Sequence, residues 1–538
     1  MNYWKNLLRV ILKRNSLTIF LIFIILCSFS SVHAEQHESR KAVLIIMNFT
    51  NIEKLAAMPK LNRLMQNGAV GLMNTRGASK TDSDRAYATL GWGSRADVLT
   101  SQSFVQKNSS SFYLKEIDEI KKLNLNNPYN IKVGLLGDFL HSQGLKTSFI
   151  GSQIIQGQQI FPGALIAVDG NGIIDSGIID NQILLYNSET NGYRTDYEAL
   201  LNVFKMEYSK RQFIVIDTGD TSRYEYYGGI GRMLQPSKED VLQDIDKFIG
   251  QLTEEIDDKN TLLIVLSPHY GSEDARLGRK LCPVVFYGAD TKSGLLASDT
   301  TRRPGIIGNI DIAPTIISFF GGTSENVTGR IAKTIETGDH LKKISDLFRL
   351  TAFNSLNRTI ILKTYVAFQI VLLLIILIFI LISASAARVL NNDSDKQKER
   401  RIRRLLQIMV LFTLICPLTL FIMPLLNINS LPVYALLLVS ITAILGLLVY
   451  KIVKDQEMSI IIISAITAIS ILVDLLLNGP LNKTSLLGYD AVIGARYYGL
   501  GNEYMGILIA AVLTAVLPLA QKGKLPRGLA VILLIMVL

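Results

Sequence analysis

Cysteine is scarce in this chain of 538 residues, which has only Cys27, Cys282 and Cys416. The three lie far apart, in an apolar leader, in a strand-like run and in a segment apolar enough for a membrane. The sequence therefore shows neither a disulfide framework nor a cysteine-based metal site. With so few cysteines, the redox compartment cannot be inferred from them.

Charged residues are also sparse, at 19% of the chain, while 49% of the residues are hydrophobic. This composition is too apolar for an ordinary soluble protein and too charged for a protein that lies wholly in a membrane. The net charge of +10 gives no support for nucleic-acid binding, because the excess Lys and Arg lie largely in the leader and in loops between apolar runs. Anionic lipid accounts for that placement.

The first 34 residues have the pattern of a secretory signal. Basic residues precede the apolar run 17–29, and the small-residue pattern Val32, His33, Ala34 comes just before a polar segment. We expect a signal peptide over residues 1–34, with an uncleaved signal anchor as the alternative. Both would carry the following segment across the membrane.

Residues 41–346 have the pattern of one soluble α/β domain. Helix-like segments such as 52–67 and 238–256 alternate with the apolar runs AVLIIM, TSFIG, ALIAV, FIVID, TLLIVL and PVVFYG. Strands that are apolar throughout are typical of a parallel sheet covered on both faces. We therefore expect an α/β sandwich with a mostly parallel central sheet.

Residues 364–538 predict an all-α transmembrane domain of about five to six helices. Apolar segments of membrane-spanning length cover 364–383, 405–426, 432–450, 459–477 and 504–520. Another begins at Gly528 and is too short as written, which suggests a truncated C-terminus or missing partner helices.

Loop charges predict the orientation of these spans. The basic loops 396–404, 450–456 and 521–527 fall on one side, and Lys and Arg concentrate in cytoplasmic loops. Counting the spans back from these loops places the α/β domain on the outer side of the membrane. The predicted N-terminal signal independently requires the same side. We expect a multi-pass cell-membrane protein with a large extracytoplasmic N-terminal domain. The sequence as a whole fits a protein of a bacterial envelope best.

The motifs of the α/β segment, in chain order, are KAVLIIMN, MPKLNRLMQNGAVGLMNTR, SDRAYATLGWGSRA, FIVIDTGD, LSPHYG, CPVVFYG and NIDIAPTIISFFG. Their order over most of residues 41–322 resembles the alkaline phosphatase superfamily, which includes phosphodiesterases, sulfatases and phosphoethanolamine transferases. The resemblance implies an alkaline-phosphatase-like sandwich with a Ser or Thr nucleophile. It also implies two divalent metals held by Asp and His at strand ends, which stabilise the attacking and leaving oxygens.

The ligand set that the resemblance implies is only partly present. Asn48 stands where the first strand of the family ends on Asp, and asparagine brings no charge to a cation. Asp220 can stand for the Asp of an Asp-x-x-Gly-His motif, and His269 matches a family His although Pro268 replaces the Asp before it. Ser83 matches the nucleophile, with the neighbouring Thr81 as a further candidate.

The last metal-binding His of the family has no counterpart, and cationic residues stand in its place. Arginine beside an empty site opposes metal binding, so we expect no catalysis by the two-metal mechanism and no resident cofactor, with a single divalent metal as the alternative. Such a pocket can still bind phosphate, sulfate or carboxylate through arginine. The candidate arginines are Arg85, Arg95, Arg223, Arg276, Arg279, Arg302 and Arg303.

Each strand-end residue also has an ordinary structural interpretation. His269 can make a simple hydrogen bond, and Ser83 can cap the helix that follows it. Asp220 lies in the turn-rich string DTGDTS, where an Asp often bonds its own backbone.

The predicted outer loop LLGYDAVIGARYYGLGNEYMG, residues 486–506, is unlike the rest of the chain. Arg496 and Glu503 could neutralise each other, which would leave Tyr and Asn side chains to hold a polar ligand. The alternative is an interfacial loop with Tyr at the head-group level, but the glycines favour a tightly folded polar site. The candidate binding residues of this loop are Arg496, Tyr497, Tyr498, Asn502 and Glu503.

Together these features predict an integral membrane protein whose phosphatase-like outer domain is inactive and binds an anionic envelope component or a partner. That component would be a membrane lipid or an anionic polymer, and the partner another membrane protein. One alternative is a phosphotransferase or hydrolase that acts on a lipid-linked or polymer phosphate through Ser83, with Asn48, Asp220 and His269 holding one metal. Another is a transport or assembly subunit. The layout resembles the ethanolamine phosphate transferases of the glycolipid-anchor pathway, whose metal ligands are not carried here.

Overall fold

The computed structural model describes residues 40–99, 102–107, 110–155, 158–187, 192–229, 237–324, 327–386, 393–526, 528–529 and 531. The chain divides into two compact units. The α/β unit comprises the chain up to Gly271 together with 282–300 and 308–338, and the helical unit comprises 272–281, 301–307 and the chain from Asp339 onward. The predicted signal peptide lies outside the described residues.

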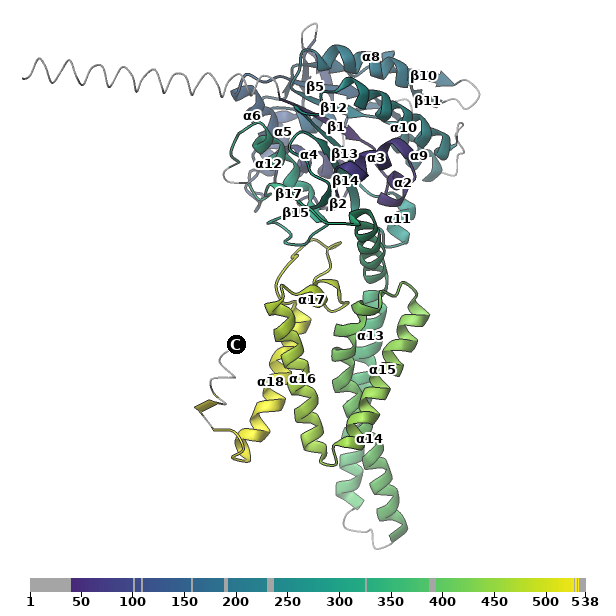
Figure 1. Cartoon of the computed structure of the whole chain (residues 1–538), viewed down its shortest axis with the longest axis vertical. Helices are drawn as coiled ribbons and strands as arrows, with labels where there is room; N and C mark the ends of the chain where they lie inside the picture. The colour runs from purple at the N-terminus through teal and green to yellow at the C-terminus, as the bar shows by residue number, and fades with distance from the viewer. Residues whose placement is uncertain are drawn as a thin grey trace, which may run out of the picture. The chain divides into compact units, whose positions relative to one another are not determined.

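The α/β unit is built on a mixed sheet with the strand order β17-β15-β2-β14-β13-β1-β12-β5-β9 (Figure 1). Neighbours from β13 to β9 are parallel, whereas β14 is antiparallel to both of its neighbours. The mostly parallel sheet predicted from the sequence is therefore confirmed. The strand bounds are β1 (Lys41–Ile46), β2 (Ala69–Asn74), β5 (Thr147–Gly151), β9 (Ser176–Ile178), β12 (Phe213–Asp217), β13 (Thr261–Leu266), β14 (Cys282–Gly288), β15 (Gly294–Ser298) and β17 (Ala332–Ile335).

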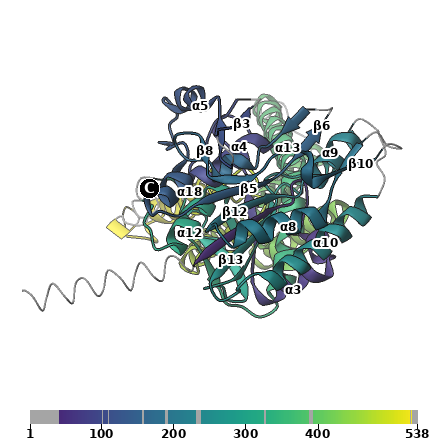
Figure 2. The same ribbon diagram turned by 90° about the horizontal axis from the view of Figure 1, so that it is seen from above.

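Helices cover this sheet on both faces. Every residue of β2, β5, β12 and β13 is buried, which is possible only when neither face meets solvent. Figure 2 shows the helices packed around the central strands. The covering helices are α3 (Pro59–Asn67), α4 (Ser83–Trp92), α6 (Leu135–Ser142), α7 (Ala164–Ala167), α8 (Tyr197–Tyr208), α10 (Lys238–Glu255) and α12 (Ile312–Phe319).

Two local predictions differ from the structure. The run ALIAV, predicted as a strand, forms the buried helix α7, because periodicity cannot distinguish a short apolar strand from a helix buried on all sides. The single helix predicted over 52–67 divides into α2 (Ile52–Ala56) and α3, since Pro59 disfavours helical geometry at Met58. The helix predicted over 238–256 is confirmed as α10.

A histidine held between two carboxylates lies beside the β5–β9 edge of the sheet. His141 on α6 bonds Asp169 Oδ2 through Nδ1 at 3.0 Å and Asp175 Oδ2 through Nε2 at 2.9 Å. Asp175 also accepts the backbone N–H of Thr147, the first residue of β5. The hydrogen bond to Asp169 and, after it, the one to Asp175 raise the pKa of His141 to about 9, although partial burial opposes the shift.

Replacing His141 with glutamine is expected to lower the free energy of unfolding by about 1–2 kcal/mol near pH 6, once solvent screening of the partly exposed site is allowed for. Because the folded pKa lies above the ordinary value of 6.5, the stabilisation is complete below pH 6.5 and is lost as the pH rises through about 9. Urea unfolding of the full chain in detergent would measure this. Of the two tryptophans, Trp92 is buried in the α/β unit, so its fluorescence in a Trp4→Phe background reports that unit. A loss that stays constant from pH 6 to pH 10 would contradict the expectation.

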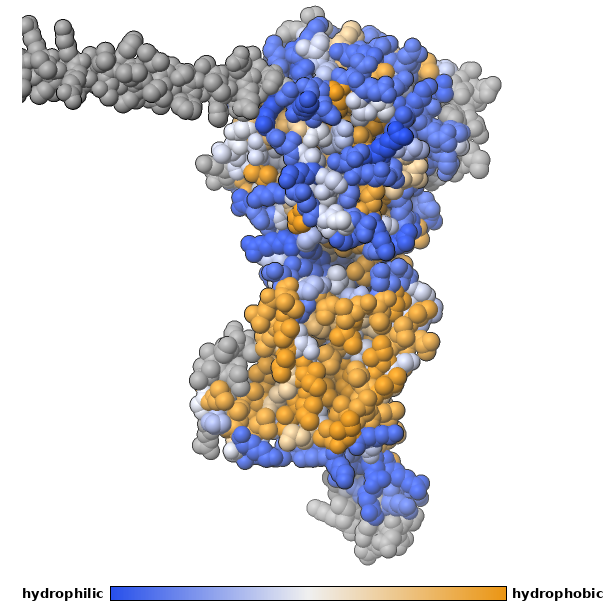
Figure 3. All heavy atoms as spheres, viewed as in Figure 1, coloured by the Kyte–Doolittle hydropathy of each residue, from blue (hydrophilic) through white to orange (hydrophobic). Residues whose placement is uncertain are grey.

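The helical unit contains five helices long and apolar enough to cross a membrane among the described residues. Each of them covers all or nearly all of one of the five apolar segments predicted from the sequence, whose helical structure is therefore confirmed, and Figure 3 shows the apolar band that they form. The segment predicted from Gly528 lies almost wholly outside the described residues. The helices are α13 (His340–Ala386), α14 (Asp393–Ile422), α15 (Leu431–Ile452), α16 (Gln456–Leu476) and α18 (Asn502–Gln521).

Candidate functional site

The carboxyl ends of the parallel strands bring the predicted strand-end residues to one edge of the sheet. Asn48 follows β1, and His269 follows β13, its parallel neighbour. The Asn48 Oδ1 atom accepts the backbone N–H of His269 at 2.9 Å. Asn48 therefore ties two neighbouring loops together, and its carbonyl oxygen already has a donor.

The His269 ring is held in one tautomer. Nδ1 donates to the Tyr270 carbonyl at 2.9 Å, and the two rings stack with their centroids 4.1 Å apart. Burial lowers the pKa of His269, so the ring is neutral near pH 7. Its Nε2 atom is buried without a hydrogen bond to any described residue, and its lone pair can accept one proton donor or one cation.

Asp220 is held by an arginine. Its Oδ1 atom accepts from Arg223 Nη2 at 2.6 Å and from Nε at 3.1 Å, and both side chains are almost fully buried. Its Oδ2 atom accepts from the Tyr197 hydroxyl at 2.8 Å. Arg223 reaches further, with Nη1 donating to the Ser152 carbonyl at 2.9 Å and Nη2 to Thr195 Oγ1 at 2.6 Å. The guanidinium therefore neutralises the carboxylate that the motif would offer to a metal.

A second carboxylate at this edge, Asp217, was missed by the sequence analysis. It is the last residue of β12, and its oxygens accept from Gln153 Nε2 at 2.7 Å and from the Gly219 N–H at 3.0 Å. Complete burial raises the pKa of Asp217 to about 6, although both hydrogen bonds oppose the shift. The signal in the sequence was its place at the end of FIVID, where an apolar strand run closes on a carboxylate.

Ser83 is the first residue of α4, and the neighbouring Asp82 is the N-cap. The Asp82 carboxylate accepts the Arg85 N–H at 3.0 Å, so the interpretation of Ser83 as the cap is wrong. Burial, and then repulsion from Asp82, raises the pKa of Asp84 to about 6, while Arg85 and the Ser83 hydroxyl oppose this. Ser83 therefore lies beside a carboxyl group that is half protonated near pH 6.

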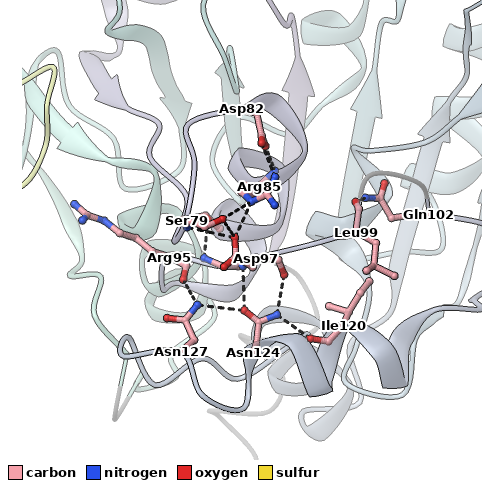
Figure 4. Close-up of polar contacts among 12 residues, drawn as sticks. Ser79, Asp82, Arg85, Arg95, Asp97, Leu99, Gln102, Ile120, Asn124 and Asn127 are labelled. Atoms are coloured by element: carbon pink, nitrogen blue, oxygen red, sulfur yellow. Dashed lines mark hydrogen bonds and ion pairs between the residues drawn. The ribbon is translucent and has the colours of Figure 1, made fainter.

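Arg85, a predicted anion-binding residue, is already held by two carboxylates (Figure 4). Nη1 pairs with Asp82 Oδ2 at 2.5 Å, and Nε pairs with Asp97 Oδ1 at 2.7 Å. Asn124 fixes Asp97 in turn, because its amide bonds both backbone groups of that residue. Two carboxylates neutralise this arginine and oppose the binding of a further anion.

The two-metal site that the resemblance implies does not fit these residues. Among the residues that the structure describes, no group of three or more His, Cys, Asp or Glu side chains is placed to hold a metal ion. Asp220 is neutralised by Arg223, Asn48 carries no charge, and His269 offers a single nitrogen. Two divalent cations need several anionic ligands, which this edge does not gather.

Of the other predicted arginines, Arg95 lies in the α/β unit, with its guanidinium 5.4 Å from the centre of the Tyr129 ring, and the remaining four fall in the helical unit. Arg276 ends α11 (Ser272–Arg276), and the Arg279 guanidinium lies 4.0 Å from Asp274 and 5.9 Å from the centre of the Phe348 ring. Arg302 and Arg303 belong to the segment 301–307 of the same helical unit.

The predicted loop site is folded differently from the expected pairing. Glu503 bonds Arg358 Nη2 on α13 at 2.6 Å, while Arg496 Nη1 bonds the Tyr489 hydroxyl at 3.2 Å. Tyr497 is buried, and Tyr498 lies 4.3 Å from the Arg302 guanidinium across its ring face. The Tyr489 hydroxyl also donates to the Asn502 amide oxygen at 3.5 Å.

A cavity of about 210 Å³ lies inside the helical unit, between α13, the segment 301–307 and the loop around α17 (Pro480–Thr484). Three cations and one carboxylate line it: Arg303, Arg358, Lys483 and Asp490. Arg303 donates to the Tyr497 carbonyl at 2.5 Å and to the Tyr489 carbonyl at 2.8 Å, which positions the guanidinium without neutralising it. Arg303 was predicted from the sequence as an anion-binding residue, whereas Arg358, Lys483 and Asp490 were not.

The electrostatics of this cavity favour an anion. Burial lowers the pKa of Arg303 to about 10, with Asp490 opposing, and it lowers the pKa of Lys483 together with the neighbouring Arg303. Burial also raises the pKa of Asp490, which weakens the one carboxylate of the lining as a counterion. Partly desolvated cations in excess are stabilised by a bound anion.

Comparison with known proteins gives likeness in fold only. No protein-family model and no curated protein matches the chain. Solved structures match about half of it, among them an alkaline phosphatase superfamily protein from Vibrio parahaemolyticus, with 18% identity and a TM-score of 0.34 over 54% of this chain and 69% of that one. The lipoteichoic acid synthase LtaP from Listeria monocytogenes matches with 12% identity and a TM-score of 0.36 over 54% and 74%. The C-terminal periplasmic domain of EptC from Escherichia coli matches with 13% identity and a TM-score of 0.32 over 52% and 82%. Each of these likenesses covers about half of this chain and concerns the fold alone.

Proposed function

We propose that this chain is a multi-pass membrane protein that binds an anionic envelope component through the cavity of its helical unit. The observation that carries the proposal is the excess of cations there: Arg303, Arg358 and Lys483 stand against two carboxylates, Asp490 in the lining and Glu503, which pairs with Arg358. Guanidinium groups pair with phosphate in a bidentate geometry, and two of the three cations are arginines. A phosphate-bearing ligand suits the cavity in both charge and size.

Titration with glycerol phosphate tests this proposal. The full chain, purified in an uncharged detergent, is expected to bind it with a Kd that rises about tenfold on Lys483→Gln, as the loss of one cation contact of about 1.4 kcal/mol requires. Binding should weaken as salt is raised. Lys451→Gln, at the far end of α15, is the matched control and should leave the Kd unchanged. The absence of binding by the unaltered chain would overturn the proposal.

We further propose that the α/β unit does not carry out two-metal phosphoryl transfer. The support is the buried Asp220–Arg223 pair, in which a cation occupies the side of the carboxylate that a metal would need. Elemental analysis of the full chain, purified without chelators, is expected to find zinc and manganese well below one atom per chain. Stoichiometric metal that is lost on His269→Ala would contradict this.

A phosphotransferase or hydrolase that uses Ser83 is the second candidate function. It is favoured by the place of Ser83 at the first residue of α4, where backbone N–H groups and the helix dipole stabilise anions. Under this alternative, Ser83→Ala would abolish hydrolysis of a phosphodiester by the manganese-loaded chain. Under our proposal, the unaltered and Ser83→Ala chains show the same background rate.

A further inference from the structure

We infer that the anion held by the helical unit is the phosphate head group of a membrane lipid, and that its hydrocarbon chain lies in an apolar crevice between α13, α14 and α15. This inference rests on the proposed anion-binding function and names the class of ligand. Its basis is a second hollow in the same unit that begins where the cationic cavity ends.

The second hollow is a crevice of about 490 Å³ without a charged residue in its lining. Ile361, Tyr365 and Phe368 of α13 form one wall, while Phe412 of α14 and Ala435 of α15 form the opposite side. These helices are three of the five that are long and apolar enough to cross a membrane. A crevice in such a surface is apolar enough and long enough for one hydrocarbon chain.

The cavity and the crevice share two walls. Arg358 lines the cavity and Ile361 lines the crevice three residues later on α13, a rise of about 4.5 Å along the helix. On the other side, Ser485 lines the cavity and donates its hydroxyl to the carbonyl of Leu420, which lines the crevice. A single molecule can therefore extend from one hollow into the other.

Only an amphiphile satisfies both hollows at once. A free phosphate or a soluble polymer would meet the cations but would leave the apolar crevice uncovered. A neutral lipid would fill the crevice but leave the excess of cations without an anion, since three cations stand there against Asp490 and the Arg358-bound Glu503. Basic pockets between membrane helices are typical binding sites for anionic lipid head groups.

Competition between two lipids tests the inference. The full chain would be exposed in uncharged detergent micelles to equal amounts of phosphatidylglycerol and phosphatidylcholine with identical acyl chains, and the lipid that it retains would be extracted and counted. We expect phosphatidylglycerol to be enriched about tenfold, which corresponds to about 1.4 kcal/mol of selectivity for the anionic head. Lys483→Gln should reduce the enrichment severalfold. Arg303→Gln should abolish it, and Lys483→Gln keeps the test valid if Arg303→Gln does not fold.

Two tryptophan variants on α15 test whether the crevice holds the hydrocarbon chain. Ala435→Trp fills it from α15, whereas Leu436→Trp places the same ring one residue further on, at a side chain that is 67% exposed and does not line the crevice. We expect Ala435→Trp to reduce retention of both lipids severalfold and to leave the glycerol phosphate Kd unchanged. Leu436→Trp should alter neither quantity.

The possible failures are distinguishable. Equal retention of the two lipids by the unaltered chain, or equal effects of the two tryptophan variants, would overturn the lipid inference. If glycerol phosphate nevertheless bound with the predicted dependence on Lys483, the source of the anion would be a soluble phosphate, and the proposed function would stand. If glycerol phosphate failed to bind while lipid was retained without selectivity for charge, both proposals would fall.

Discussion

Replacing Arg223 with methionine is expected to lower the free energy of unfolding of the α/β unit by about 3–5 kcal/mol, the cost typical of breaking a buried ion pair from one side. Arg223 is 1% exposed and Asp220 is 2% exposed, so solvent cannot replace the lost guanidinium. Asp220 would keep the Tyr197 hydroxyl as a donor, but its negative charge would be left buried and unpaired. The Ser152 carbonyl would lose its donor as well.

Urea unfolding followed by Trp92 fluorescence would measure this loss. Lys205→Met is the matched control, since Lys205 pairs with Glu255 at 2.8 Å between side chains that are 44% and 40% exposed, and its loss should cost less than about 1 kcal/mol. Adding Asp220→Asn to the Arg223→Met chain should recover part of the stability, because the unpaired charge is then removed. If the double variant were no more stable than Arg223→Met alone, the loss would come from packing and not from the ion pair.

The same buried pair shows what could not be predicted from the sequence. The motif order located the loop after β12, and the string DTGD pointed to Asp220 as a metal ligand. Arg223, which neutralises Asp220, is only three residues further on, but the groups that fix its guanidinium are distant, since Thr195 and Ser152 lie 28 and 71 residues away. Local patterns predict strands and their ends well, but they do not reveal which long-range hydrogen bonds will hold a nearby charge against a carboxylate.

In the helical unit, too, local elements could be predicted from the sequence, whereas the long-range contacts that form its cavity could not. Five membrane spans could be predicted from length and apolar composition alone, because a bilayer sets both. Arg303, in contrast, looked like part of the α/β unit, and its membership of the helical unit depends on bonds to Tyr489 and Tyr497, 186 and 194 residues away. Asp490 lies in the loop 486–506 singled out from the sequence, but neither it nor Lys483 was named as a binding residue, because only the folded loop brings them into one cavity with Arg358.

Replacing Asp217 with asparagine is expected to stabilise the α/β unit at neutral pH by about 3 kcal/mol, since each unit of pKa shift corresponds to about 1.4 kcal/mol. The pKa of this fully buried carboxyl is raised from 3.8 to about 6. The folded state therefore holds a proton that the unfolded state has released between these values, so stability is greatest below pH 3.8 and falls as the pH rises to about 6. Asparagine is neutral at every pH, and the Gln153 amide can turn to offer its oxygen to the new NH₂ group.

The expected signature is a difference between the two chains that grows with pH and then levels off. Urea unfolding at pH 4, 5, 6 and 7, followed by Trp92 fluorescence, should show equal stability of the unaltered and Asp217→Asn chains at pH 4 and the full gain above pH 6. Asp246→Asn is a matched control, because this buried carboxylate accepts the N–H groups of Lys60 and Leu61 at the start of α3. Its loss should therefore destabilise the unit. A gain for Asp217→Asn that is the same at pH 4 and pH 7 would show that the gain does not come from the titration of this carboxyl, and that burial does not raise its pKa on folding.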